Sequence, residues 1–118
     1  MDAKQLGQKG EAAAAKFYLR QGCKLLAHGY RTRQGELDLV LLQGDTVIVA
    51  EVKTRSPGAQ VPALQAVTPR KQRRVILAAQ RFLQANGLLE HSIRFDAVEV
   101  VFRDGKYFVR CIPNAFSL

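Results

Sequence analysis

Apolar and polar positions alternate most regularly between Gly35 and Arg55, in two predicted strands joined by a two-residue turn. In the first strand one face carries Leu37, Leu39 and Leu41, and the other carries Glu36, Asp38 and Val40. The second strand, residues 46–54, is rich in β-branched residues. Gly44-Asp45 suits a type II′ turn, because glycine readily takes the positive φ required at its first central position.

The register set by this turn has an electrostatic consequence. It places Asp38 opposite Glu51, and Glu36 opposite Lys53. Carboxylates facing each other across a ladder have Cβ atoms about 5 Å apart and repel each other. A divalent cation between them, with Lys53 beside it, would reverse the sign of that interaction. Oxygen ligands suit Mg²⁺ or Mn²⁺ better than zinc. The alternative is a solvated ladder in which Glu36 pairs with Lys53.

The remaining patterns predict two helices and three more strands. The first helix covers residues 3–21 and stops at Gly22, while Gly10 within it allows close approach to a neighbouring backbone. The second begins at Thr68-Pro69, as N-cap and first helical residue, and ends near Asn86. We expect its apolar side to contain Val75, Ile76, Ala79, Phe82 and Leu83.

Three further strands complete the prediction, over residues 23–32, 93–102 and 106–112, and residues 56–67 read as a flexible loop with two prolines. The order αβββαββ favours an α/β fold with a central mixed sheet flanked by helices. The apolar strands 47–52 and 98–101 are expected to be covered on both faces.

Length and composition fit one domain over residues 1–118, since 47% of the residues are hydrophobic. Cys23 and Cys111 have no metal-ligand spacing and read as free thiols of a reducing compartment. The first residues lack a signal-peptide core, and no apolar run approaches the about 20 residues of a membrane span. We therefore expect a cytoplasmic protein with no membrane partner.

The net charge of +8 favours a polyanionic partner, and nucleic acid is the usual one; general solubility is the alternative. Cations gather near the ends of the central hairpin and at the start of the second helix. They are Arg31, Arg33, Arg55, Arg70, Lys71, Arg73 and Arg74. The first turns of a helix disfavour cations, and a phosphate backbone would compensate. The alternative is a solvated helix face.

Four sequence blocks carry a family resemblance. They are Gly7-x-x-Gly10-Glu11, Gly35-Glu36-Leu37-Asp38-Leu39-Val40, Ala50-Glu51-Val52-Lys53-Thr54-Arg55 and Arg94-Phe95-Asp96-Ala97-Val98. The Asp38…Glu51-x-Lys53 spacing resembles the PD-(D/E)xK motif of restriction-endonuclease-like nucleases. In their order over nearly the full chain, the blocks resemble the YraN-like family of small bacterial proteins, which is similar to archaeal Holliday-junction resolvases.

This resemblance implies a restriction-endonuclease-like core with the site on its central hairpin. It implies Asp38, Glu51 and the Val52 carbonyl as ligands of Mg²⁺ or Mn²⁺, and Lys53 as the catalytic lysine. Glu11 matches a family glutamate that approaches the metal. The chain departs from the pattern at Leu37, where the motif usually has proline, and at Ala50, where the family often has a β-branched residue.

Two functions follow as hypotheses. One is a metal-dependent endonuclease acting on branched or structured DNA. The other is a non-catalytic nucleic-acid-binding module or a scaffold of DNA processing. A homodimer is implied by the resolvase relatives, and the apolar tail residues Ala115, Phe116 and Leu118 are candidates to dock on a partner. We expect Arg94 and Asp96 to form a structural ion pair, and Tyr30 to pack in the core rather than stack on a base.

Overall fold

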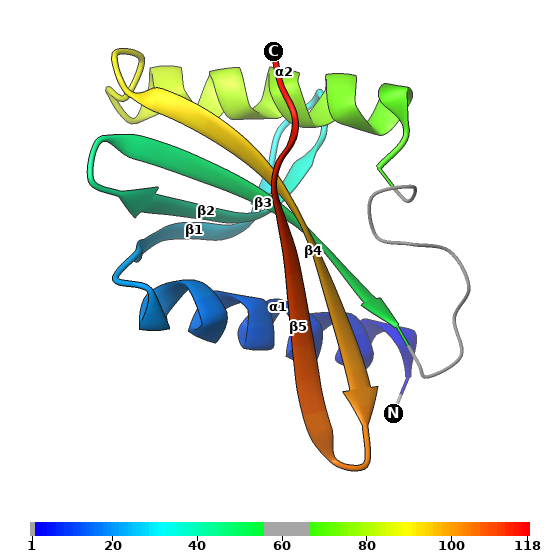
Figure 1. Cartoon of the computed structure of the whole chain (residues 1–118). Helices are drawn as coiled ribbons and strands as arrows, with labels where there is room; N and C mark the ends of the chain where they lie inside the picture. The colour runs from blue at the N-terminus through cyan, green and yellow to red at the C-terminus, as the bar shows by residue number, and fades with distance from the viewer. Residues whose placement is uncertain (1, 56–66) are drawn as a thin grey trace.

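The computed structural model describes residues 2–55 and 67–118. Its elements are α1 (Ala3–Arg20), β1 (Lys24–Arg31), β2 (Glu36–Gln43), β3 (Thr46–Arg55), α2 (Pro69–Ala85), β4 (Ser92–Arg103) and β5 (Lys106–Phe116). The strands form one five-stranded sheet in the order β1-β2-β3-β4-β5, with a helix on each face (Figure 1). In this sheet only β3 and β4 run parallel, and the crossover between them contains α2. This confirms the predicted αβββαββ order and mixed sheet.

The helix ends lie where the sequence predicts them. Asp2 caps α1, and Gly22 follows that helix with φ +86°. Thr68 caps α2 by accepting a hydrogen bond from the Lys71 N–H, and Pro69 is its first residue. The loop expected over 56–67 lies outside the described residues except for Val67, which is buried. Neither described helix is both long and apolar enough to cross a membrane.

The core has two halves, one on each face of the sheet, and β3 contributes to both. Val47 and Val49 pack with the α2 face, whereas Ile48 and Ala50 pack with the α1 face. This confirms that the central strand is covered on both sides. The buried face of α2 consists of Val75, Ala78, Ala79, Phe82 and Leu83, close to the prediction.

The α1 helix lies close against β3. Its buried face runs through Gly10, Ala14 and Tyr18, whereas Ala13 and Phe17 are only partly buried. A Cβ atom on Gly10 would lie 1.7 Å from Thr54 Oγ1 and 2.8 Å from Thr54 Cβ. Glycine is therefore required where α1 approaches β3. The sequence predicted a close approach at Gly10, but to a neighbouring backbone, whereas the contact is with the Thr54 side chain.

The central hairpin has the predicted register. Its Cα pairs run from Leu39–Ala50 to Gln43–Thr46, and Gly44 has φ +58°. The prediction that Leu37 shares a face with Leu39 and Leu41 is wrong, because Leu37 packs in the α2 half of the core. Next to this point of β2, Gly29 of β1 has φ +59° and lies between the His28–Leu39 and Tyr30–Leu37 pairs. Ala27 and Tyr30, on either side of it, both pack on the α2 face, so β1 also departs from strict alternation here.

The last strand is longer than predicted. It continues past residue 112 to Phe116, whose ring stacks on Phe95 with centroids 4.9 Å apart. Phe116 thus packs partly against the chain's own core, whereas Leu118 is exposed, and docking of the tail on a partner stays a prediction.

Candidate functional site

Asp38 and Glu51 meet where the β2–β3 ladder ends. The Val52 N–H donates to Asp38 Oδ2 at 2.8 Å, and the Asp38 N–H donates to Glu51 Oε2 at 3.4 Å. Each carboxylate therefore accepts a hydrogen bond from a backbone N–H of the other strand. These two bonds take the place of the backbone–backbone hydrogen bonds that would continue the ladder beyond Leu39 and Ala50. Strand separation at Asp38 is what brings both side chains to one point.

Glu51 is buried, with 5% of its surface exposed, and one of its oxygens is unsatisfied. Glu51 Oε1 has no hydrogen-bond partner. The nearest cation is Lys71 of α2, whose Nζ lies 3.6 Å from Oε1, an ion-pair distance but too long for a hydrogen bond. A buried carboxylate oxygen left this way is costly for folding and available to a ligand.

Burial dominates the electrostatics of this pair. It raises the pKa of Glu51 to about 8, with a further contribution from the charge of Asp38 and an opposing one from Lys71. The pKa of Asp38 is also raised, chiefly by burial, although its hydrogen bond from Val52 and the charge of Lys71 oppose the shift. The two carboxylates thus resist being ionised together without an added cation.

Lys53 and Glu11 border this pair. Strand alternation places Lys53 on the same face of β3 as Glu51, with its side chain exposed, and its charge lowers the pKa of Asp38. Burial, followed by the charges of Asp38 and Glu36, raises the pKa of Glu11 to about 7. Within the described parts of the chain, no three His, Cys, Asp or Glu side chains are grouped closely enough to hold a metal by themselves, and a part for Glu11 at the metal stays a prediction.

The donor atoms at the site suit a hard divalent cation. Glu51 Oε1 is buried and unbonded, and Asp38 supplies a second carboxylate. The N–H and C=O of a strand residue point toward the same neighbouring strand, so the Val52 carbonyl faces the side of Asp38 as its N–H does. An all-oxygen set of this kind fits Mg²⁺ or Mn²⁺.

Glu36 does not pair with Lys53. It lies directly opposite Arg31 in the β1–β2 ladder, and the Arg31 Nε to Glu36 Oε2 distance is 3.6 Å. The alternative of a Glu36–Lys53 ladder therefore does not form, because β2 turns toward β1 beyond Asp38.

The seven cations of the predicted basic cluster divide into four groups. Arg31, Lys71 and Arg74 line a groove of about 490 Å³, together with Thr32, Gly35, Glu36 and Val75. Arg55 is directed elsewhere: its side chain is 9% exposed, with Nε 3.2 Å from Glu99 Oε2. Arg70 and Arg73 are exposed on α2 outside this groove, and Arg33 belongs to a neighbouring hollow. Three of the seven cations thus line the groove next to the carboxylates.

Sequence reasoning missed two features of this region. Lys71 was expected to contact phosphate, whereas the fold brings it to Glu51. Arg81 was left out of the cluster, yet it lines the neighbouring hollow with Arg33. Helical spacing could have found Arg81, because it follows Arg74 by two turns and shares its face.

Comparison with known proteins identifies the family. The profile of the uncharacterised protein family UPF0102 matches residues 10–100, which include Glu11, Asp38, Glu51 and Lys53. A UPF0102 protein of Anaeromyxobacter dehalogenans is 43% identical over 112 residues, covering 95% of this chain and 84% of the relative. Those of Geobacter metallireducens and Stutzerimonas stutzeri are 39% and 40% identical, covering 98% of this chain and 94% and 98% of the relatives. The predicted YraN-like resemblance is thereby confirmed, and the chain belongs to the UPF0102 family.

Proposed function

We propose that this protein is a nuclease-like, nucleic-acid-binding protein that hydrolyses phosphodiesters with a divalent metal held at Asp38 and Glu51. The observation that carries the proposal is the buried Glu51 Oε1, which has no hydrogen bond and lies beside a second carboxylate. The α/β core and the Asp38…Glu51-x-Lys53 spacing resemble those of restriction-endonuclease-like nucleases, and this supports the reaction class.

Asp38, Glu51 and the Val52 carbonyl would hold the ion. Bound Mg²⁺ or Mn²⁺ supplies Lewis-acid activation of water and offsets charge on a phosphate. Lys53, exposed on the same face as Glu51, would offset the negative charge of a phosphate bound at the metal. Val52 fixes the orientation of the Asp38 carboxylate through its N–H, so this ligand is positioned by β3 before any metal arrives.

The groove beside the carboxylates suits the substrate. Arg31, Lys71 and Arg74 are its cations and Glu36 its acid, and the net charge of the chain is +8. Phosphate contacts of this kind position a nucleic acid without reading its sequence. We therefore expect DNA to be held by its backbone, with branched or structured DNA as the substrate that the resolvase resemblance suggests.

The test is calorimetry with Mn²⁺ combined with cleavage of four-way-junction and linear DNA. Wild type should bind Mn²⁺ and cleave, whereas Asp38→Asn and Glu51→Gln should lose both. Glu90→Gln is the matched control, because Glu90 is an exposed glutamate remote from the hairpin in sequence and forms no ion pair with the described residues. Cleavage that persists in the purified Asp38→Asn/Glu51→Gln double variant would falsify the assignment.

One observation favours a second candidate, a binding module that does not cut. Lys71 already places a cation 3.6 Å from Glu51 Oε1, where a metal would otherwise supply the charge. A non-catalytic module would give no heat with Mn²⁺, and its DNA binding would be unaffected by chelator. The same calorimetry therefore decides between the two functions.

A further inference from the structure

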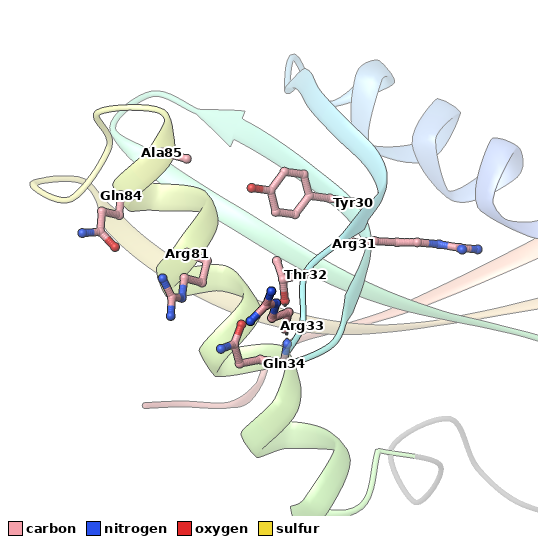
Figure 2. A pocket seen from close by; sticks show the side chains of 8 residues that line it. All are labelled: Tyr30, Arg31, Thr32, Arg33, Gln34, Arg81, Gln84 and Ala85. Carbon is pink, nitrogen blue, oxygen red and sulfur yellow. Dashed lines mark hydrogen bonds between the residues drawn. The ribbon is translucent and has the colours of Figure 1, made fainter.

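A second hollow adjoins the groove at the candidate site. It lies between the β1–β2 connection and the C-terminal half of α2 and has a volume of about 520 Å³ (Figure 2). Its lining consists of Tyr30, Arg31, Thr32, Arg33, Gln34, Arg81, Gln84 and Ala85. None of these residues belongs to the carboxylate pair.

This hollow is the middle part of a longer track. It shares Arg31 and Thr32 with the groove that contains Lys71. On its other side it shares Gln34, Arg81 and Gln84 with a smaller hollow of about 260 Å³ on α2. We refer to these three adjoining hollows together as the track; their lining residues on α2 run from Lys71, beside Glu51, to Ala85.

The hollow lined by Arg33 and Arg81, the middle one of the three, has a positive charge that favours binding of an anion. Arg33 and Arg81 both line it, the first from the connection and the second from α2, whereas Arg31 is directed away from α2 (Figure 2). Within residues 2–55 and 67–118, no carboxylate forms an ion pair with Arg33 or Arg81. Two guanidinium groups gathered without an acid repel each other, and a phosphate between them would remove the repulsion.

The wall that carries Arg33 is held in place by its own hydrogen bonds. Thr32 Oγ1 accepts from the N–H groups of Gln34 and Gly35, each at 3.1 Å, and the Thr32 N–H donates to the Gly35 carbonyl at 2.8 Å. Gly35 allows this connection to lie against α2, since a Cβ there would be 3.2 Å from Arg74 Cβ. A preorganised wall lowers the entropy cost of binding.

The remaining lining suits a base. The amide groups of Gln34 and Gln84 can each donate and accept hydrogen bonds. Tyr30 is partly buried, and its ring makes an edge-to-face contact with the ring of Phe82, with the two centroids 5.1 Å apart. The Tyr30 ring is therefore part of a rigid wall. Basic grooves with an aromatic side chain and amides are typical of sites for unpaired strands, whose base edges are free.

We infer that this track takes an unpaired strand of nucleic acid that leaves the candidate site. Arg33 and Arg81 hold a phosphate, while Gln34 and Gln84 contact the adjacent base. The ring of Tyr30 packs against the core, as predicted, and forms the wall of the hollow beside them. The inference rests on the proposed nucleic-acid binding, but it requires neither metal nor cleavage. It specifies the substrate class as DNA or RNA with a single-stranded arm rather than a fully paired duplex.

The test is fluorescence anisotropy without metal, using labelled duplexes that carry a single-stranded arm (armed duplexes) and labelled duplexes that do not (blunt duplexes). Arg33→Ala/Arg81→Ala should weaken binding of the armed duplex at least about tenfold, since charge-assisted hydrogen bonds are lost, and change blunt-duplex binding little. Its salt slope on the armed duplex should fall by about 0.7, for the one single-strand phosphate that the two arginines hold. Gln84→Ala should weaken binding of the armed duplex about two- to tenfold with an unchanged salt slope.

The matched control is Lys24→Ala/Lys106→Ala, which removes the same charge from exposed positions outside the track. It should bind armed and blunt duplexes with the wild-type preference. Equal weakening of both duplexes by Arg33→Ala/Arg81→Ala, or no weakening, would overturn the inference and leave the proposed function standing. If the wild-type protein binds no nucleic acid at all, both this inference and the proposed function are wrong. Loss of Mn²⁺ binding alone affects only the proposed nuclease activity.

Discussion

Glu51 and Asp96 are the two buried carboxylates in the described parts of the chain, and they differ in how they are satisfied. Asp96 accepts hydrogen bonds from Arg94 Nε and Nη2 at 2.9 Å each, from the Tyr18 hydroxyl at 2.7 Å and from the Asn114 N–H at 3.2 Å. Glu51 has an oxygen with no hydrogen bond and a pKa raised to about 8 by burial. A carboxylate surrounded by donors stabilises a fold, whereas one left short of donors is a place for a ligand.

The position of Asp96 explains its donors. It lies on β4, and its donors come from α1, β4 and the end of β5, so the carboxylate joins three elements. The Arg94–Asp96 ion pair predicted from the sequence is confirmed, with both guanidinium contacts made to one carboxylate. Glu51, by contrast, lies where two strands part.

The largest effect should come from Asp96→Ala. The substitution leaves Arg94, the Tyr18 hydroxyl and the Asn114 N–H without their acceptor, and breaking a buried charge pair costs about 3–5 kcal/mol. Urea denaturation measures the change. Glu90→Ala, at an exposed glutamate, should stay within about 0.5 kcal/mol of wild type. A similarly small change for Asp96→Ala would show that the hydrogen bonds to Asp96 do not stabilise the fold.

Glu51→Gln, in contrast to Asp96→Ala, should increase the free energy of unfolding near pH 8. The pKa of Glu51 is raised from 4.5 to about 8 in the folded state, so between these pH values the unfolded chain loses this proton while the folded protein keeps it. The free energy of unfolding is therefore highest below about pH 4.5 and falls as pH rises toward 8. At about 1.4 kcal/mol per unit, the ionised carboxylate costs a few kcal/mol at pH 8. Glutamine removes that cost.

The measurement is the free energy of unfolding of wild type and Glu51→Gln at several pH values. Wild type should lose stability between pH 4.5 and 8 relative to the variant. Mn²⁺ should restore it in wild type only, because ligands that bind the folded state stabilise it. Parallel pH profiles for the two proteins would mean that Glu51 is as well satisfied as Asp96.

Tyr18→Phe tests one donor of Asp96 by itself. The phenol hydroxyl donates to Asp96 and lies 3.4 Å from Cys111 Sγ. Its loss should cost about 1–1.5 kcal/mol, since the ring is kept and Arg94 still satisfies the carboxylate. A double-mutant cycle with Asp96→Asn measures the coupling. A coupling near zero would show that the hydroxyl does not contribute to holding Asp96.

Lys71→Met should have the smallest effect on stability. The Lys71 side chain is 52% exposed, and such pairs contribute less than about 1 kcal/mol. Because the charge of Lys71 lowers the pKa of Glu51, its removal should shift the pH dependence of stability to higher pH. Arg70→Met, at the exposed neighbouring cation, is the control. An equal shift in both variants would show that the net charge of α2, and not the Lys71 contact, acts on Glu51.

The sequence alone determined the parts that depend on neighbours along the chain. Thr68-Pro69 specified the start of α2, Gly22 the end of α1, and Gly44-Asp45 the hairpin register that brings Asp38 beside Glu51. Each is a local conformational preference of a few residues, so a short window is sufficient to predict it.

Only the tertiary structure decided which charges are buried and which meet. Lys71 reaches Glu51 because the β3–β4 crossover lays α2 over that face, and Arg55 meets Glu99 because β3 and β4 run side by side. The donors of Asp96 come from positions as distant in sequence as Tyr18 and Asn114. Desolvation depends on every element packed around a group, so the difference between Glu51 and Asp96 follows from the packed sheet and its helices and not from either sequence neighbourhood.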